Sequence, residues 1–181
     1  MAWLERWFLN GLRAETLRLM PASARILEVG AGTGLNFIFY PPGSAAVASE
    51  PSREMLRIAE GRLPANGVRL LQSEAERLPF ASGSFDAAFA TLVFCSVSSP
   101  AQAFAELRRV VKPGGSVVLL EHVRPGGILG LLFDLFNLIT VPLFDDHFNR
   151  RTADEARKSG LQLVRVEKRK LGIINLIECR V

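Results

Sequence analysis

The sequence predicts an α/β protein built on a Rossmann-like, doubly wound sheet of seven strands. From residue 25 to about residue 120, short apolar runs alternate with segments of helical periodicity, a pattern typical of βαβ units and a parallel sheet. Two further apolar runs end the chain, with a short connection at residues 171–172. They predict a C-terminal antiparallel hairpin on a mostly parallel sheet. The 181 residues, 49% of them apolar, fit a single domain spanning 1–181.

The same periodicity predicts the individual elements. Residues 1–20 are expected to form an N-terminal helix that covers the sheet or a ligand cleft, because apolar side chains recur at helical spacing from Trp3 and Pro21 stops the pattern. The other expected helices are 52–62, 100–111 and 151–159, and the expected strands are 26–29, 45–49, 68–71, 85–94, 116–120, 161–168 and 173–181.

Charge and cysteine content narrow the class of protein. The net charge of +4 is scattered, apart from a basic run at 165–170 that alternates with apolar residues and is expected on a solvated strand edge, so no nucleic-acid partner is expected. Two cysteines fit neither a disulfide scaffold nor a zinc pattern, and the cluster Asp145, Asp146 and His147 lacks metal-ligand spacing. No metal is expected. No secretory signal is recognisable, which predicts a cytoplasmic protein.

A glycine-rich bend, residues 28–34 (EVGAGTG), directly follows the first expected strand. Its glycines allow a sharp turn and a close approach of the backbone to a ligand. A helix is expected immediately afterwards, with its N-terminal N–H groups facing the same space. Ligands of open parallel sheets lie at this carboxyl edge. The alternative is a tight turn that binds nothing.

Two carboxylates bear on which ligand the bend would hold. Leu35 stands where the third glycine of the dinucleotide fingerprint would be. Glu50 ends the second expected strand and can accept both hydroxyls of an adenosine ribose, which suits NAD and S-adenosylmethionine equally. Glu28 would repel a pyrophosphate but attract a sulfonium and an ammonium group. The pair therefore favours a cationic nucleoside.

Several segments together resemble a known family. The bend resembles motif I of the class I S-adenosylmethionine-dependent methyltransferases, and residues 73–86 and 107–115 resemble the signatures of the ubiquinone/menaquinone-biosynthesis type. Residues 36–43, 91–97 and 121–123 are similar to the methyltransferase-like 7 family of alkyl thiol methyltransferases. Members of that family carry an N-terminal membrane-anchoring helix that this sequence does not match, so a soluble relative is expected.

The resemblance implies S-adenosylmethionine as cofactor and assigns roles to residues that follow the strands. The bend would lie against the methionine part of the cofactor, Glu28 would hold its amino group through water, and Glu50 would bind the ribose. Met55 would pack on the adenine, whereas Glu74, where the family usually has Asp, would accept from the adenine amino group. The cofactor-binding residues so implied are Glu28, Gly30, Ala31, Gly32, Gly34, Glu50, Pro51, Met55, Glu74, Ala75 and Thr91.

The methyl acceptor is expected beyond the ends of the fourth and fifth strands. Thr91 would face the sulfonium and the acceptor, and His122 is a candidate base or hydrogen-bond partner, with a structural histidine as the alternative. Residues 126–148, rich in phenylalanine, are expected to cover the acceptor pocket together with the N-terminal helix. Apolar walls favour a small lipophilic thiol, phenol or quinol. The apolar stretch 128–144 is short for a membrane span and contains Asp134 and Pro142, so interfacial membrane contact is the minor alternative.

Two other functions stay open at this point. The domain could bind S-adenosylmethionine or S-adenosylhomocysteine without turnover, or it could be a nicotinamide-dependent oxidoreductase. The oligomeric state and the acceptor atom do not follow from the sequence.

Overall fold

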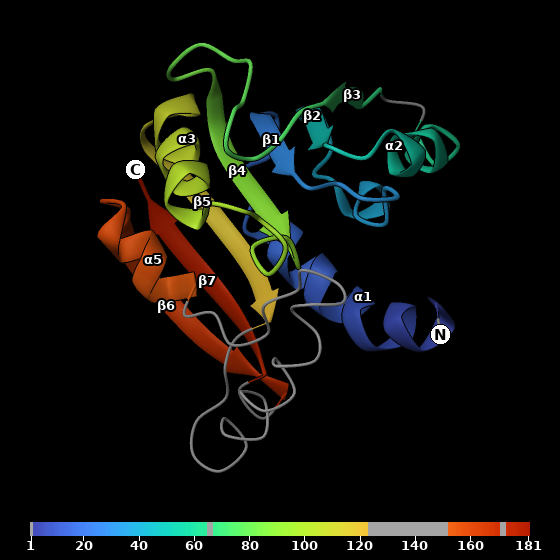
Figure 1. Ribbon diagram of the computed structural model, residues 1–181. Coiled ribbons are helices and arrows are strands. Elements are labelled where there is room, and N and C mark those ends of the chain that lie inside the picture. The colour runs from blue at the N-terminus through green and yellow to red at the C-terminus, as the bar shows by residue number, and fades with distance from the viewer. Residues whose placement is uncertain (1, 65–66, 123–151, 171–172) are drawn as a thin grey trace.

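The computed structural model describes residues 2–64, 67–122, 152–170 and 173–181 of the chain. Its centre is a seven-stranded sheet with the strand order β3-β2-β1-β4-β5-β7-β6 (Figure 1). Strands β1 to β5 pair in parallel, whereas β7 is antiparallel to both β5 and β6. The strands are β1 (Arg25–Val29), β2 (Ala45–Glu50), β3 (Arg69–Gln72), β4 (Phe85–Thr91), β5 (Val111–His122), β6 (Gln162–Arg169) and β7 (Ile174–Arg180). The predicted fold class is confirmed.

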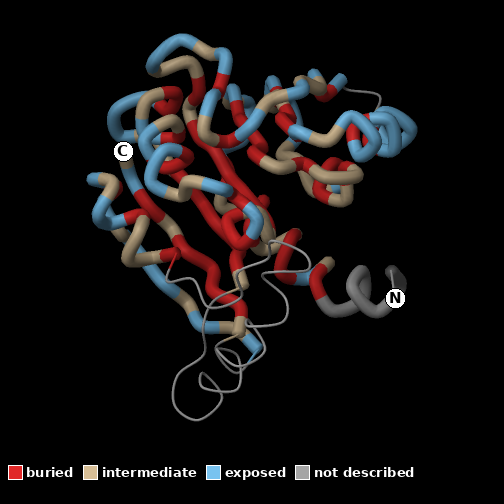
Figure 2. The backbone as a smooth tube through the Cα atoms, in the orientation of Figure 1, coloured by how far each residue is buried: buried red, intermediate tan, exposed pale blue. Residues whose placement is uncertain are grey.

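Helices cover both faces of this sheet, and each face has its own apolar core. The helices are α1 (Ala2–Arg18), α2 (Arg53–Glu60), α3 (Pro100–Val110) and α5 (Thr152–Lys158), with a 3-10 turn, η1, at Phe37–Phe39. Phe104 of α3 and Ala156 of α5 belong to one cluster, and Leu17 of α1 belongs to the other. Successive strand residues alternate between the clusters, so the central strands are buried on both sides (Figure 2).

The prediction of a helix after the glycine bend is wrong. No helix follows the glycine bend, where the described chain forms turns and only the single 3-10 turn η1 before β2. Pro41 and Pro42 come too soon after Gly34 for a helix to develop, and Tyr40, which precedes them, has the extended ψ of 138° that a following proline imposes. Elsewhere the expected elements exist, with shifted ends. β4 stops at Thr91 instead of residue 94, and β5 begins already at Val111.

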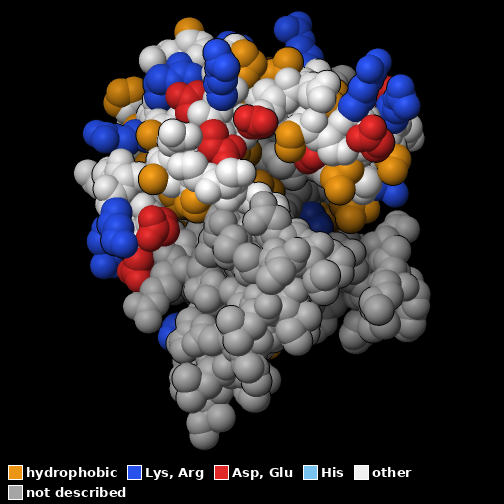
Figure 3. Space-filling view, in the orientation of Figure 1, with side chains coloured by type: hydrophobic (Ala, Val, Ile, Leu, Met, Phe, Trp, Pro, Cys, Tyr) orange, Lys and Arg blue, Asp and Glu red, His pale blue; other side chains and the backbone are white. Residues whose placement is uncertain are grey.

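The strand that contains the basic run lies at the edge of the sheet, as predicted. β6 is the outer strand, and its residues are exposed or half-buried throughout. Arg165 and Arg169 form ion pairs with Glu167. On the face with the cavity described below, basic and acidic side chains are interspersed over the described surface (Figure 3). Within the described residues, no helix combines the length and the apolar character that crossing a bilayer requires.

Candidate functional site

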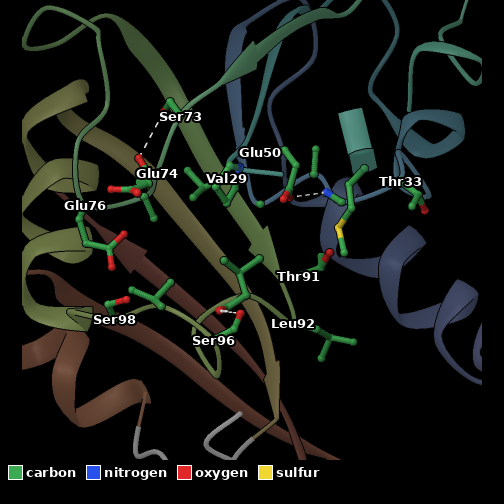
Figure 4. Close-up of a pocket in the computed structure, with 18 of the residues that line it drawn as sticks. Val29, Thr33, Glu50, Ser73, Glu74, Glu76, Thr91, Leu92, Ser96 and Ser98 are labelled. Atoms are coloured by element: carbon green, nitrogen blue, oxygen red, sulfur yellow. Dashed lines mark hydrogen bonds between the residues drawn. The ribbon is translucent and has the colours of Figure 1, made fainter. Parts of the chain in front are cut away.

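A cavity of about 740 Å³ lies at the carboxyl ends of β1, β2 and β4 (Figure 4). Three expected site residues do not line it: Glu28, Gly34 and His122. The remaining ones come together around it, although they derive from five separate segments. These residues are Gly30, Ala31, Gly32, Glu50, Pro51, Met55, Glu74, Ala75 and Thr91.

The glycine bend forms the floor of the cavity, and two of its glycines are required for different reasons. Gly30 has φ +69°, and a Cβ there would lie 2.4 Å from Cγ2 of Val93, so no larger residue fits. Gly32 has φ +56° but no atom within 4 Å of its Cβ direction, because that side opens into the cavity. The bend thus presents bare backbone to a ligand.

Glu50 ties this bend to the end of β2. Its Oε2 accepts from the Gly32 N–H at 2.9 Å, and its Oε1 accepts from the Ser52 N–H at 3.0 Å. The Ala31 N–H donates to the Ser49 carbonyl at 2.9 Å. Glu50 is 6% exposed, and each carboxylate oxygen keeps further acceptor capacity for hydroxyl groups in the cavity. The carboxylate is therefore held in place before any ligand arrives.

The far side of the cavity is formed by the start of α2 and by the segment after β3. Met55 lines it from the first turn of α2, where the Ser52 side chain caps the helix by accepting from the Met55 N–H at 3.3 Å. Its side chain is 45% exposed, unusual for a large apolar residue. Glu74 and Glu76 lie across the cavity from Thr33 (Figure 4). The Ser73 N–H donates to the Glu50 carbonyl, which fixes this segment against β2.

A buried polar network lies behind the cavity wall. Glu28 is fully buried in β1, where its carboxylate accepts from Asn36 Nδ2 at 2.5 Å and from the Tyr40 hydroxyl. Arg13 of α1 donates through Nη1 to Asn36 Oδ1 at 2.8 Å and to Thr91 Oγ1 at 3.0 Å. Asn36 Nδ2 also donates to Thr91 Oγ1 at 2.8 Å. Arg13 of α1 and Asn36, which follows the bend, thus both donate to Thr91 at the end of β4.

Burial changes the acid–base properties of this network. Removal from water raises the pKa of Glu28 to about 7, although the bonds from Tyr40 and Asn36 and the charge of Arg13 act in the opposite direction. Burial, and then the charge of Glu28, also raises the pKa of the Tyr40 hydroxyl well above its usual value. Glu28 therefore titrates near neutral pH, while Tyr40 remains a donor.

The loop after β4 forms the remaining wall, and a buried glutamate of β5 holds it. The Val93 N–H and the Phe94 N–H both donate to the Glu121 carboxylate, at 3.1 Å each for the shorter contacts. Leu92 takes φ +58°, rare for a residue with a branched side chain, and its N–H donates to the Leu120 carbonyl at 2.7 Å. His122, a candidate base or a structural histidine, lies half-buried at the end of β5 opposite Ile174 of β7.

Sequence reasoning missed four members of this site: Arg13, Asn36, Tyr40 and Glu121. A signal existed only for Arg13. It lies four residues after Leu9 and four before Leu17, so it occupies the apolar stripe of α1, where a cation is unexpected. The expected acceptor cover at 126–148, with Phe133, Phe136, Phe144 and Phe148, falls outside the described residues.

Comparisons with known proteins agree on one family. The sequence model of a methyltransferase domain family matches residues 27–119. The chain is 34% identical to thiol S-methyltransferase TMT1B of Rattus norvegicus over 78% of its own length and 62% of the relative's. It is 37% identical to demethylmenaquinone methyltransferase of Thermus thermophilus over 68% of its own length and 59% of the relative's. The chain therefore spans less than two thirds of either relative.

Solved structures support the same assignment. A SAM-dependent methyltransferase of Thermotoga maritima, described as a possible histamine N-methyltransferase, superposes with a TM-score of 0.73 at 25% identity, over 99% of this chain and 95% of that one. A putative methyltransferase of Haloferax volcanii, in complex with its Trm112 activator, gives 0.80 at 15% identity over 99% and 92%, a likeness of fold alone. The chain belongs to the methyltransferase domain family and has the fold of the class I S-adenosylmethionine-dependent methyltransferases.

Proposed function

We propose that this protein transfers a methyl group from S-adenosylmethionine to a small lipophilic acceptor, a thiol, phenol or quinol. The observation that carries the proposal is the pairing of Glu50 with the open face of Gly32. A carboxylate fixed by two backbone N–H groups lies beside bare backbone at the carboxyl edge of a parallel sheet.

The residues present fit the cofactor along its whole length. Glu50 would bind the ribose hydroxyls, and Met55 would pack on the adenine, whose amino group would donate to Glu74. A Cβ at Gly32 would occupy the open space in which the methionine part would lie. When bound, the cofactor supplies an electrophilic methyl group on a sulfonium. The chain's task is then to orient the acceptor and to exclude water.

Glu28 would act on the cofactor through charge. Its carboxylate lies behind the bend and does not line the cavity, so it would attract the cationic groups from beneath. Burial raises its pKa to about 7, and a cation placed above it would favour the ionised form. Cofactor affinity should therefore rise as Glu28 loses its proton.

The acceptor end of the cavity supports a small apolar substrate. Leu92, Val93 and Val97 line it together with Thr91. The two curated relatives are named for a thiol and for demethylmenaquinone, both of which fit an apolar wall with a few polar groups. Thr91 would contact the reacting atoms, His122 remains a candidate base, and a cover from 126–148 remains a prediction.

Replacing Glu50 tests the cofactor site directly. Glu50→Ala should weaken S-adenosylhomocysteine binding by about 1–3 kcal/mol if both ribose hydrogen bonds form. Glu60→Gln on the exposed side of α2 is the matched control and should change nothing. Calorimetry measures both dissociation constants. An unchanged value in Glu50→Ala would reject the ribose role, and binding of NAD in preference to S-adenosylhomocysteine would reject the proposal.

Turnover needs its own assay. Wild type should release S-adenosylhomocysteine with at least one class of acceptor in a panel of thiols, phenols, quinols and amines. Tight cofactor binding without release across the panel would instead support a non-catalytic binding module.

A further inference from the structure

We infer that Val93 is a positioning residue, whose side chain holds the loop after β4, at the acceptor end of the cavity, at a fixed distance from the glycine bend at the cofactor end. The inference rests on the proposed function and adds to it the residue that sets the distance between methyl donor and acceptor. Val93 acts through the two segments that it separates and takes no part in the chemistry itself.

The side chain of Val93 lies directly against the backbone of Gly30. A Cβ at Gly30 would lie 2.4 Å from Val93 Cγ2 and 2.7 Å from Val93 Cγ1. Carbon atoms in contact are about 3.5–4.0 Å apart, so the two methyl groups occupy the space that a side chain at residue 30 would need. Both residues line the cavity. The contact between the bend and the loop is therefore part of the cavity wall.

The backbone of Val93 is fixed from another direction, by β5. Its N–H donates to both carboxylate oxygens of Glu121, at 3.1 and 3.2 Å, and the Phe94 N–H donates to Glu121 Oε2 at 3.1 Å. The Leu92 N–H donates to the Leu120 carbonyl at 2.7 Å. Because Glu121 is fully buried, a shift of the loop would take hydrogen bonds away from a carboxylate that water does not reach. Val93 is thus held between β5 and the bend.

The turn that leads into Val93 is strained. Leu92 has φ +58°, a left-handed conformation that a leucine keeps only where the surrounding structure enforces it. Strained residues of this kind cluster at functional sites, where the strain holds a group in a required place. Here the turn brings the next residue between Glu121 and Gly30. The strain indicates that the place of Val93 matters for function.

A valine is suited to act as a spacer between two reactants. Its branched Cβ restricts χ1, so the two methyl groups form a stiff unit close to the backbone. Methyl transfer depends on the separation of the reacting atoms, which is about 3–3.5 Å in a productive complex, and a misplacement of about 1 Å costs roughly 100-fold in rate. With the cofactor on the bend and the acceptor against the loop, Val93 keeps this separation.

The test is the rate of a single turnover in Val93→Ala. The protein is loaded with S-adenosylmethionine and mixed with a saturating acceptor from the panel, so that product release does not limit the rate. Removal of both methyl groups lets the loop and the bend change their separation, and the rate should fall by about tenfold. The dissociation constant of S-adenosylhomocysteine, measured by calorimetry, should stay as in wild type.

Three further variants separate positioning from packing. Val93→Thr keeps the branched shape at Gly30 and should react within about twofold of wild type. Val93→Leu keeps the bulk but has a single Cγ, so it should lose rate, and it decides the question if Val93→Ala does not fold. Val166→Ala, on the exposed edge strand β6, is the matched control and should be unchanged. A wild-type rate in Val93→Ala, or equal rates in the Leu and Thr variants, would overturn the inference.

A double variant tests the contact itself. Gly30→Ala is expected to clash with the methyl groups of Val93, and in Val93→Ala the nearest remaining atom of that residue is Cβ, at 3.2 Å. Gly30→Ala should therefore lower the denaturation midpoint less in the Val93→Ala background than in wild type. Equal shifts in the two backgrounds would show that the bend and the loop are not coupled through Val93, and would contradict the inference.

The outcome is separable from that of the proposed function. Turnover by wild type, with a Val93→Ala protein that reacts as fast, would remove the role of Val93 and leave the methyltransferase proposal intact. A loss of cofactor affinity in Val93→Ala as large as in Glu50→Ala would place Val93 in the cofactor site instead. The absence of methyl transfer to every acceptor in the panel would remove both proposals.

Discussion

The two ends of the cavity are built in different ways. The cofactor end consists mainly of backbone, and its bonds join residues close in sequence, such as Gly32 to Glu50 at a separation of 18. The acceptor end consists of side chains brought together from distant segments, and the bond between Arg13 and Thr91 spans 78 residues. The first end is therefore encoded in a local motif, whereas the second exists only once the sheet and α1 have assembled.

Two carboxylates near the cavity, Glu50 and Glu28, also differ in how they are held. Glu50 is held by N–H groups at the cavity rim and faces the ligand space. Glu28 is bonded by Asn36 and Tyr40, both from the segment between the bend and β2, and burial raises its pKa to about 7. Glu50 is therefore placed to contact a ligand directly, whereas Glu28 contributes charge from behind the cavity wall.

The largest expected effect is a difference in stability between alanine substitutions at Gly30 and at Gly32. Gly30→Ala should destabilise the fold by about 2–5 kcal/mol, because a left-handed backbone and a clash with Val93 act together. Gly32→Ala meets open space and should cost only the backbone strain, about 1–2 kcal/mol. Chemical denaturation measures both changes.

For cofactor binding we expect the opposite order, with Gly32→Ala affecting affinity more than Gly30→Ala does in the folded protein. Gly32→Ala places a methyl group in the ligand space and should weaken S-adenosylhomocysteine binding even where the protein is fully folded. Two variants of equal stability, or a Gly32→Ala protein with normal affinity, would contradict the division of roles between the glycines.

A second prediction concerns pH. The pKa of Glu28 is raised from 4.5 to about 7 in the folded state, so its contribution to stability is complete below 4.5 and is lost as pH rises through 7. The loss corresponds to about 3 kcal/mol. Glu28→Gln should remove this slope and should be more stable than wild type above neutral pH. The measurement is the difference in unfolding free energy between the two proteins from mildly acidic to mildly alkaline pH.

The same substitution tests the charge effect on the cofactor. Glu28→Gln should bind S-adenosylmethionine more weakly than wild type at alkaline pH and equally at acidic pH, where wild-type Glu28 is protonated. Parallel stability curves for the two proteins, with no difference in slope, would show that Glu28 is not the titrating group.

The smallest of these effects lies at the acceptor end. In Glu121→Gln, an amide oxygen at the Oε2 position can still accept from both the Val93 and the Phe94 N–H, which lie 3.2 and 3.1 Å from Oε2. The substitution therefore removes the charge from these hydrogen bonds, at a cost of about 1 kcal/mol. The loop after β4 should loosen, which raises KM for the acceptor while the cofactor dissociation constant stays constant. Glu60→Gln serves again as the control. A loss of cofactor affinity comparable to that of Glu50→Ala would place Glu121 in the other wall.

Local patterns in the sequence predicted the sheet well, because each buried strand is a short apolar run and each connection has its own turn residues. The C-terminal hairpin, and the bend and Glu50 at the carboxyl edge, were predicted from the pattern of strands, whereas Met55 and Glu74 were assigned to the site through the family resemblance. The helix predicted after the bend does not form, because Pro41 and Pro42 follow Gly34 too closely for a helix to develop.

The polar network could not be predicted, since its bonds depend on where α1 crosses the sheet. No spacing rule relates Arg13 to Asn36, or Tyr40 to Glu28, before the fold exists. The roles of His122 and of residues 126–148 remain predictions.

The missing helix has a consequence for how the site could diverge. The connection from β1 to β2 is short and contains η1 and two prolines. It therefore keeps Tyr40 close to β1, where the ring packs edge-on against Phe37 and Phe89. An insertion of a few residues there would carry the phenol away from Glu28 and leave the acid with one partner fewer. The length of the connection between β1 and β2 thus affects the acidity of a buried carboxylate. Insertions and deletions there could change the pKa of Glu28 without altering any residue that lines the cavity.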